Sequence, residues 1–376
     1  MLVAAPERNE LDIDLLTSPT LRQHVMNAEW QAVLQQAGAT WLQETVAHFG
    51  QPEAEEQALR LGEFRCDLSH RGLIAVRGPD SATFLQGQLS CDVQQATLER
   101  SVLGAYCNPQ GRTLACFRLW QEEGGYLLTL PRALVAPTLT CLGRYVLRAK
   151  VALADASDSV GRMGVAGSHA VGLLEEYGST RGPSLAADKI RRVNQITICG
   201  VPGCPPRFEL YGPAQELGAL WNQLSSQLLA VGTESWRLLD ILAGIPTVYP
   251  ATVAAFVPQM LNLDRLGGIG WQKGCYTGQE IVARTHYLGK LKRRMILARV
   301  ECPTPPQPGA ALFSPHASAS QSAGQLVDAA RHPDGDFAVL AVVLLACAEP
   351  GGLQLGAVDG PTLRLESLPY ALTDPA

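Results

Sequence analysis

The sequence has no excess of positive charge. Its formal net charge is −5 at pH 7, so no overall basic field attracts the chain to nucleic acid or to a membrane surface. Aromatic and basic residues do not interleave in the way that single-stranded nucleic acid favours. No apolar run reaches the roughly 18 residues of a membrane span, and the longest run, residues 338–348, is expected to be a buried strand. We therefore expect neither a membrane contact nor direct binding of nucleic acid.

Export and metal-binding patterns are also missing. The first residues contain an acidic run rather than a basic start followed by an apolar core, so we expect no signal peptide. The ten cysteines are scattered and contain no CxxC motif. Cys199 and Cys204 lie near each other, but no second pair completes a tetrahedral zinc site or a stable iron–sulfur cluster. We expect no metal site, and we expect reduced thiols in a cytoplasmic protein.

What the sequence does contain is a dense stretch at residues 267–295, GGIGWQKGCYTGQEIVARTHYLGKLKRRM, which we call the KGCYTGQE segment. Thr277, followed three residues later by Glu280, predicts a capping box at the start of a helix. Gly274 and Gly278 leave room for a ligand or another backbone to approach closely. The segment therefore predicts a glycine-rich turn that leads into a capped helix.

Cys275 lies just before this expected helix. The partial positive charge of a helix N-terminus favours a thiolate, and Lys273 nearby adds to that effect. The pattern predicts a reactive thiol at Cys275, supported by Lys273. The alternative is a buried cysteine in a tight turn, since free cysteines are often simply buried.

The run KGCYTGQE resembles the signature of the YgfZ family. The resemblance covers roughly residues 73–295 and includes LIAVRGPDSATFLQGQLSCDV, GAYCNPQGRTLACFRLW and FVPQMLNLDRLGGIGWQKGCYTGQEIVAR. Members of that family are folate-binding proteins related to the aminomethyltransferase of the glycine cleavage system. They are linked to the assembly and repair of iron–sulfur clusters and to some tRNA modifications.

The resemblance implies an α+β fold in which mixed α/β modules form an aminomethyltransferase-like ring around a central pocket, with an antiparallel β-barrel at the C-terminal end. The turn signal Asp334-Gly335 agrees with such a barrel. The expected parts are an N-terminal helical extension (1–60), a first folate-binding module (61–158), a second α+β module (159–245), a stretch that returns to the pocket (246–300) and the barrel (301–376).

The resemblance also implies folate contacts. Glu209, in RFELYGP, is similar to a pterin-contacting glutamate of the aminomethyltransferases, and a carboxylate suits the paired N–H donors of the pterin; the alternative is an exposed strand residue. Trp236 is similar to a folate-contacting tryptophan, since an indole stacks on flat heterocycles; the alternative is a core anchor for its helix. Gln86, with Gln88 and Asp92, either lines the pocket or is an ordinary exposed polar side chain. From the KGCYTGQE segment the implied contacts are Tyr276, Gly278, Gln279, Glu280 and Arg284.

Three positions depart from the patterns of these relatives. The folate-dependent aminomethyltransferases carry acidic residues, one of them catalytic, where this chain has Ala115 and Cys116. Neither residue can serve as the carboxylate that orients or relays a proton to the methylene-bearing nitrogen. A second folate-contacting tryptophan of the YgfZ family would fall near Arg71, where this chain has no aromatic residue.

The leading hypothesis is a folate-binding accessory protein whose ligand is tetrahydrofolate or a derivative. It would serve iron–sulfur proteins or their assembly machinery, including iron–sulfur enzymes that modify tRNA, with Cys275 as a reactive thiol. One alternative is a tetrahydrofolate-dependent aminomethyl or one-carbon transferase, against which Ala115 and Cys116 count. The other is a non-catalytic scaffold that binds a partner through the KGCYTGQE segment.

Overall fold

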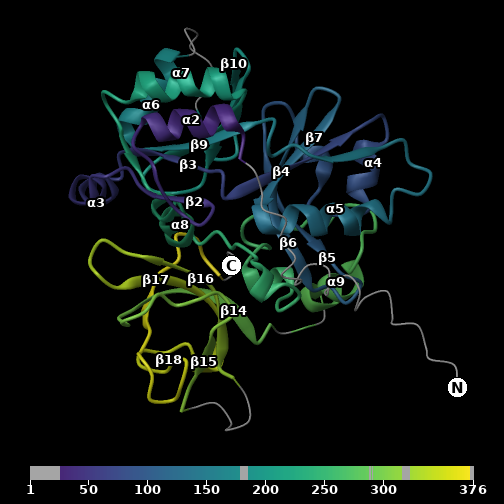
Figure 1. Ribbon diagram of the computed structural model, residues 1–376. Coiled ribbons are helices and arrows are strands. Elements are labelled where there is room, and N and C mark those ends of the chain that lie inside the picture. The colour runs from purple at the N-terminus through teal and green to yellow at the C-terminus, as the bar shows by residue number, and fades with distance from the viewer. Residues whose placement is uncertain (1–25, 178–184, 288, 290, 316–321, 373–376) are drawn as a thin grey trace, which may run out of the picture.

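The computed structural model describes residues 26–177, 185–287, 289, 291–315 and 322–372 (Figure 1). These residues form three modules, each built on one sheet of five or six strands, and helix α8 (Thr233–Leu242) lies between the second module and the C-terminal sheet. None of the described helices has the length and apolar character that crossing a membrane requires.

The first module is a five-stranded antiparallel sheet with the order β5-β6-β7-β4-β8. Helices α4 (Ser81–Gln86) and α5 (Val135–Gly143) place buried side chains in its core. The strands of this sheet are β4 (Arg71–Arg77), β5 (Val102–Cys107), β6 (Thr113–Glu122), β7 (Gly125–Pro131) and β8 (Ala152–Asp155).

The second module is a six-stranded sheet with the order β10-β11-β12-β9-β3-β13, antiparallel except for the parallel pair β3 and β13. Helices α6 (Ser168–Tyr177) and α7 (Ala214–Leu224) add buried side chains to its core. The strands are β3 (Phe64–Asp67), β9 (Gly161–Ala166), β10 (Ile190–Val193), β11 (Ile196–Val201), β12 (Arg207–Gly212) and β13 (Leu229–Val231). Strand β3 comes from the range expected for the first module, so the sheets do not follow the expected division of the chain.

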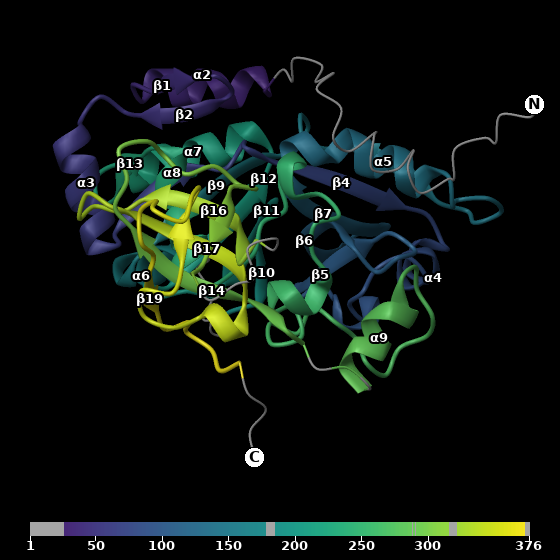
Figure 2. The same ribbon diagram turned by 90° about the horizontal axis from the view of Figure 1, so that it is seen from below.

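The N-terminal part is more than a helical extension. Helices α2 (Ala28–Gln36) and α3 (Pro52–Leu61) are present, but a hairpin of β1 (Thr40–Leu42) and β2 (Thr45–His48) separates them (Figure 2). Trp30 of α2 is buried against Trp221 of α7, with ring centroids 5.7 Å apart. The described N-terminal residues therefore belong to the core of the second module.

The C-terminal module is a six-stranded antiparallel sheet with the order β18-β15-β16-β17-β14-β19. It curls into a half-barrel, which confirms the expected antiparallel C-terminal module. One set of its apolar side chains joins the core shared with the first module and α8, and another set forms a core of its own. The strands are β14 (Arg293–Val300), β15 (Ala311–Phe313), β16 (Gly324–Arg331), β17 (Phe337–Leu344), β18 (Gln354–Leu355) and β19 (Arg364–Glu366).

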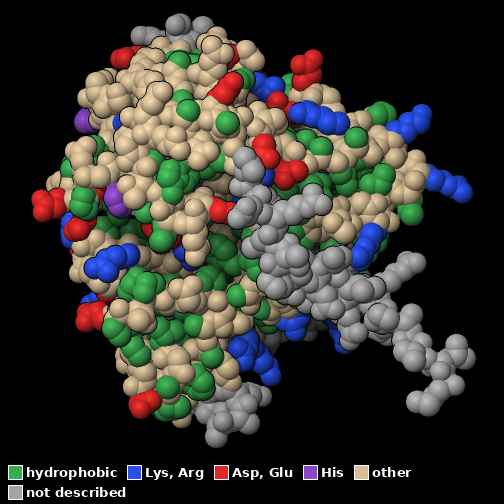
Figure 3. Space-filling model, viewed as in Figure 1, with side chains coloured by type: hydrophobic (Ala, Val, Ile, Leu, Met, Phe, Trp, Pro, Cys, Tyr) green, Lys and Arg blue, Asp and Glu red, His purple; other side chains and the backbone are tan. Residues whose placement is uncertain are grey.

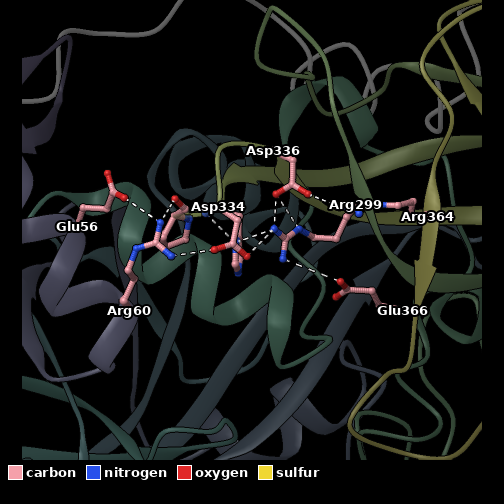
Figure 4. A network of polar contacts seen from close by, with 9 residues as sticks. Glu56, Arg60, Arg299, Asp334, Asp336, Arg364 and Glu366 are labelled. Carbon is pink, nitrogen blue, oxygen red and sulfur yellow. Dashed lines mark hydrogen bonds and ion pairs between the residues drawn. The ribbon is translucent and has the colours of Figure 1, made fainter.

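Polar contacts connect this sheet back to the N-terminal part. Arg60 of α3 donates to Asp334 at 2.8 Å, and Asp334 lies 3.4 Å from Arg299 of β14 (Figure 4). Asp336 accepts hydrogen bonds from Arg299 and Arg364. On the face in Figure 3, acidic and basic side chains are scattered rather than gathered into one patch.

The KGCYTGQE segment packs on the first module beside the turn between β5 and β6. A Cβ atom on Gly278, whose φ is +82°, would lie 2.4 Å from the backbone oxygen of Asn108. Helix α9 (Gln279–Tyr287) begins one residue later, and the Gly278 carbonyl accepts the first helical bond from Val282 at 3.3 Å. Gly278 therefore occupies the cap position, and the predicted capping box with Thr277 at that position is wrong by one residue.

Candidate functional site

A cavity of about 180 Å³ lies between the first and second modules, where the chain that follows α8 passes between them. Its walls come from β4 to β7 of the first module, from β11, β12 and α8 of the second, and from residues 245–263. This is the place where the sequence predicted a central pocket.

A buried charge cluster forms one wall of the cavity. Arg71, at the start of β4, donates hydrogen bonds to the carboxylates of Glu209 in β12 and Asp240 in α8. The second oxygen of Glu209 accepts from the Tyr211 hydroxyl at 2.6 Å, and that of Asp240 accepts from Arg207 at 2.7 Å. The Arg71 side chain is 17% exposed, whereas those of Glu209 and Asp240 expose 1% and 6%. Within this cluster, the cavity therefore reaches the guanidinium of Arg71 most readily.

Neighbouring arginines stabilise the charged form of Asp240. Burial alone would raise the pKa of Asp240, but Arg71 and Arg207 outweigh burial and lower that pKa below its ordinary value. Burial and the charge of Glu209 together raise the pKa of Tyr211, so its hydroxyl keeps its proton and donates to Glu209. The wall thus presents fixed, paired charges to a ligand.

Three arginines line the cavity, and each of them joins two parts of the fold. Arg71 joins the first module to the second, as described above. Arg118 of β6 pairs with Asp188 in the loop before β10. Arg237 of α8 donates from Nε to Asp328 of β16 at 2.7 Å. The lining of the cavity is therefore also a set of ion pairs across module boundaries.

The pair formed by Arg237 and Asp328 includes a third residue. The Tyr249 hydroxyl donates to Asp328 at 3.0 Å, and the Arg237 guanidinium lies 5.1 Å from the centroid of the Tyr249 ring. Burial raises the pKa of Asp328 above its ordinary value even though Arg237 and Tyr249 act in the opposite direction. Because Arg237 and Tyr249 line the cavity, Asp328 supports its wall from the C-terminal sheet.

His70 and Cys116 are two further titratable groups on the cavity wall, and both are uncharged. Burial lowers the pKa of His70 to about 3, so its imidazole is neutral near pH 7. Burial raises the pKa of the Cys116 thiol, which lines the cavity as a neutral group, and Ala115 beside it is fully buried. The position that departs from the aminomethyltransferase pattern therefore does face the cavity, and it carries no carboxylate.

Trp236 and Gln86 lie away from the cavity lining. Trp236 is fully buried, and a Cβ atom on Gly164 of β9 would lie 2.5 Å from its indole ring, so this residue has the position of a core anchor for α8. The Gln86 amide donates to Asp92 at 2.8 Å and accepts from the Val93 backbone at 2.8 Å. Gln86 thereby fastens the end of α4 to the turn that follows.

The KGCYTGQE segment presents Cys275 and holds Lys273. The Cys275 side chain is exposed and precedes α9 by four residues. The Lys273 ammonium donates to the backbone oxygens of Leu89 and Cys91 at 2.5 and 2.8 Å, and burial lowers its pKa to about 8. Lys273 thus fastens the segment to the first module.

The other predicted residues of this segment differ in exposure. Tyr276 is buried under the Lys273 ammonium, which lies 4.9 Å from its ring centroid. Gln279 is half-buried, whereas Glu280 and Arg284 are exposed on α9. None of these residues belongs to the lining of the cavity described above.

Sequence reasoning missed most of the charged lining. Thr233, Arg237 and Asp240 follow one another at spacings of four and three residues, so they share one face of α8. A polar stripe on an otherwise apolar helix was the signal that could have identified them. Among the described residues, no group of three or more His, Cys, Asp or Glu side chains is arranged to hold a metal ion.

Comparisons with known proteins agree with this architecture. The GCVT N-terminal domain matches residues 21–265. The chain is 30% identical over 323 residues to the tRNA-modifying protein YgfZ of Escherichia coli, covering 86% of this chain and 98% of the relative. It is 29% identical over 309 residues to the tRNA-modifying protein YgfZ of Colwellia psychrerythraea, and the match covers 81% of this chain and 93% of the relative. Its fold is similar to that of glycine cleavage system aminomethyltransferase T from Bartonella henselae (TM-score 0.69, 18% identity, 92% and 97% coverage).

Proposed function

Since this chain belongs to the YgfZ family of tRNA-modifying proteins, we propose that it is a folate-binding accessory protein for iron–sulfur proteins, among them enzymes that modify tRNA. The cavity lined by Arg71 and Glu209 carries this proposal. Its volume of about 180 Å³ is below the roughly 300–1,000 Å³ of sites that enclose a drug-sized ligand. We therefore expect it to hold the pterin ring of tetrahydrofolate, with the rest of the ligand toward the opening.

Glu209 is the residue that we expect to recognise the pterin. Each of its oxygens already accepts one hydrogen bond, from Arg71 and from Tyr211, but a carboxylate offers about four acceptor sites. The remaining sites suit the paired N–H donors of the amino-pyrimidine edge. A hydrogen bond to a charged group contributes about 1.5–3 kcal/mol, more than a neutral one.

Binding without glycine-cleavage chemistry is the role that this wall supports. Cys116 is a protonated thiol and Ala115 has no functional group, so neither supplies a carboxylate for proton transfer to the methylene-bearing nitrogen. These residues do not favour the alternative of an aminomethyl or one-carbon transferase.

We assign the reactive role to Cys275, outside the cavity. Its exposed side chain, four residues before the start of α9, is accessible to a partner protein. In the alternative of a non-catalytic scaffold, a Cys275→Ser variant would retain the function of the chain in cells. Loss of that function in the otherwise folded variant supports the reactive thiol.

Titration with tetrahydrofolate under anaerobic conditions tests the folate proposal. We expect saturable binding by isothermal titration calorimetry and at least ten-fold weaker binding by Glu209→Gln, which is about 1.4 kcal/mol. Glu175→Gln, on the exposed face of α6, is the matched control and should bind as the wild type does. Absence of binding by the wild-type chain would contradict the proposal.

A further inference from the structure

Arg71 differs from the other arginines of the cavity in how it is held. Arg237 uses Nε and both terminal nitrogens in contacts with Asp328 and Glu234. Arg118 has a side chain that is only 4% exposed. Arg71 is bound through its two terminal nitrogens and is 17% exposed, and no described residue accepts a hydrogen bond from its Nε. It is therefore the arginine with both access to the cavity and an unused donor.

The guanidinium of Arg71 is held from two sides. Glu209 lies on β12 and Asp240 on α8, and each carboxylate has a second donor that fixes it, Tyr211 and Arg207 respectively. Two such anchors on separate elements fix the plane of the guanidinium as well as its position. A planar cation held in this way points its Nε–H in one fixed direction, which a rotating ammonium group cannot do.

We propose that Arg71 contacts the heterocycle of the ligand and sets the specificity of the cavity for a flat ring with a hydrogen-bond acceptor. This inference rests on the proposed folate function. The guanidinium meets the edge of the pterin, and its in-plane Nε–H donates to an acceptor on that ring. Glu209 takes the N–H donors of the pterin, so the two side chains read complementary groups.

Fragments of the ligand distinguish this contact from a general effect on the fold. Tetrahydropterin contains the heterocycle alone, and p-aminobenzoyl-glutamate contains the rest of folate. An Arg71→Lys variant keeps the positive charge near Glu209 and Asp240 but removes the plane and Nε–H. Arg60→Lys, on the exposed end of α3, is the matched control for the same chemical change.

We expect Arg71→Lys in the full chain to lower the affinity for tetrahydropterin at least ten-fold in anaerobic calorimetry. The affinity for p-aminobenzoyl-glutamate should change less than two-fold, and Arg60→Lys should match the wild type with both fragments. Arg71→Gln repeats the test if Arg71→Lys does not fold, as judged by circular dichroism, and the same selective loss is expected.

Two results would overturn the inference while leaving the folate proposal intact. One is a folded variant that binds both fragments as the wild type does. The other is an equal loss of both fragments, which would indicate a general change in the cavity rather than a contact with the heterocycle. If the wild-type chain binds neither tetrahydrofolate nor tetrahydropterin, the proposed function fails and the inference about Arg71 fails with it.

Discussion

Asp328→Asn tests the connection between the cavity wall and the C-terminal sheet. In the wild type, Asp328 accepts from Arg237, from the Tyr249 hydroxyl and from the backbone of Ala329. Asparagine has nearly the same shape and can still accept a hydrogen bond through its carbonyl oxygen. The variant therefore removes the negative charge with little change in packing.

The structure sets the size of the effect. Removing one partner of a buried ion pair costs roughly 3–5 kcal/mol of stability, because the other charge stays buried without compensation. Asp328 is 1% exposed, but Arg237 is 21% exposed and keeps a contact of 3.0 Å with Glu234. Burial also raises the pKa of Asp328, so Arg237 and Tyr249 do not fully offset the cost of burying the Asp328 carboxylate. We therefore expect a loss below that range, about 2–3 kcal/mol.

Equilibrium unfolding in urea at pH 7 measures this loss as a shift of the midpoint. Asp334→Asn is the matched control, because the Asp334 side chain is 57% exposed in its pairs with Arg60 and Arg299 (Figure 4), and exposed pairs contribute roughly 0–1 kcal/mol. The control midpoint should lie close to that of the wild type. An Asp328→Asn midpoint equal to that of the control would refute the reasoning.

Three further predictions concern other parts of the molecule. Because the pKa of His70 is about 3 in the fold against about 6.5 unfolded, the folded state binds fewer protons between these values, and stability should fall as pH drops from 6.5. The pH dependence of the free energy of unfolding should be weaker in His70→Gln, by up to about 1.4 kcal/mol per pH unit, in urea unfolding at pH 7, 6 and 5. The same pH dependence in the variant and the wild type would contradict this. Gly278→Ala should cost about 1–3 kcal/mol, because alanine rarely adopts the positive φ, and the new Cβ atom would clash with the Asn108 backbone oxygen. Hydrogen exchange in α9 should then become faster, and unchanged exchange would count against the close packing seen there. Cys275 should react with iodoacetamide faster than Cys204, which is also exposed; equal rates would remove the basis for a reactive thiol.

Local patterns in the sequence predicted local structure well. The apolar run from residue 338 begins as the buried strand β17, and the Asp334-Gly335 turn precedes it with Gly335 at φ +99°. The helix after the KGCYTGQE motif is also present, and only its capping residue is displaced by one position from the predicted Thr277. The close approach to Asn108 requires Gly278, and that contact lies 170 positions away in the sequence, beyond the reach of a capping rule.

The cavity was harder to predict because its contacts are distant in the sequence. Arg71 and Glu209 are 138 residues apart, and Arg237 and Asp328 are 91 apart. The resemblance of RFELYGP to a pterin-contacting segment predicts Glu209, whereas nothing in the sequence around Arg71 predicts that it pairs with Glu209. Trp236 shows a second limit. Both sides of α8 are buried, so amphipathic spacing alone could not tell the side facing the cavity from the side facing the core.

The most direct test of the account is a crystal structure of the full chain with a stable reduced folate bound. We predict that the pterin lies in the cavity between the first and second modules, within hydrogen-bond distance of Glu209 and with Arg71 against its ring. A folate bound elsewhere, for example against the exposed side of the KGCYTGQE segment, with the cavity free of it, would contradict the central claim.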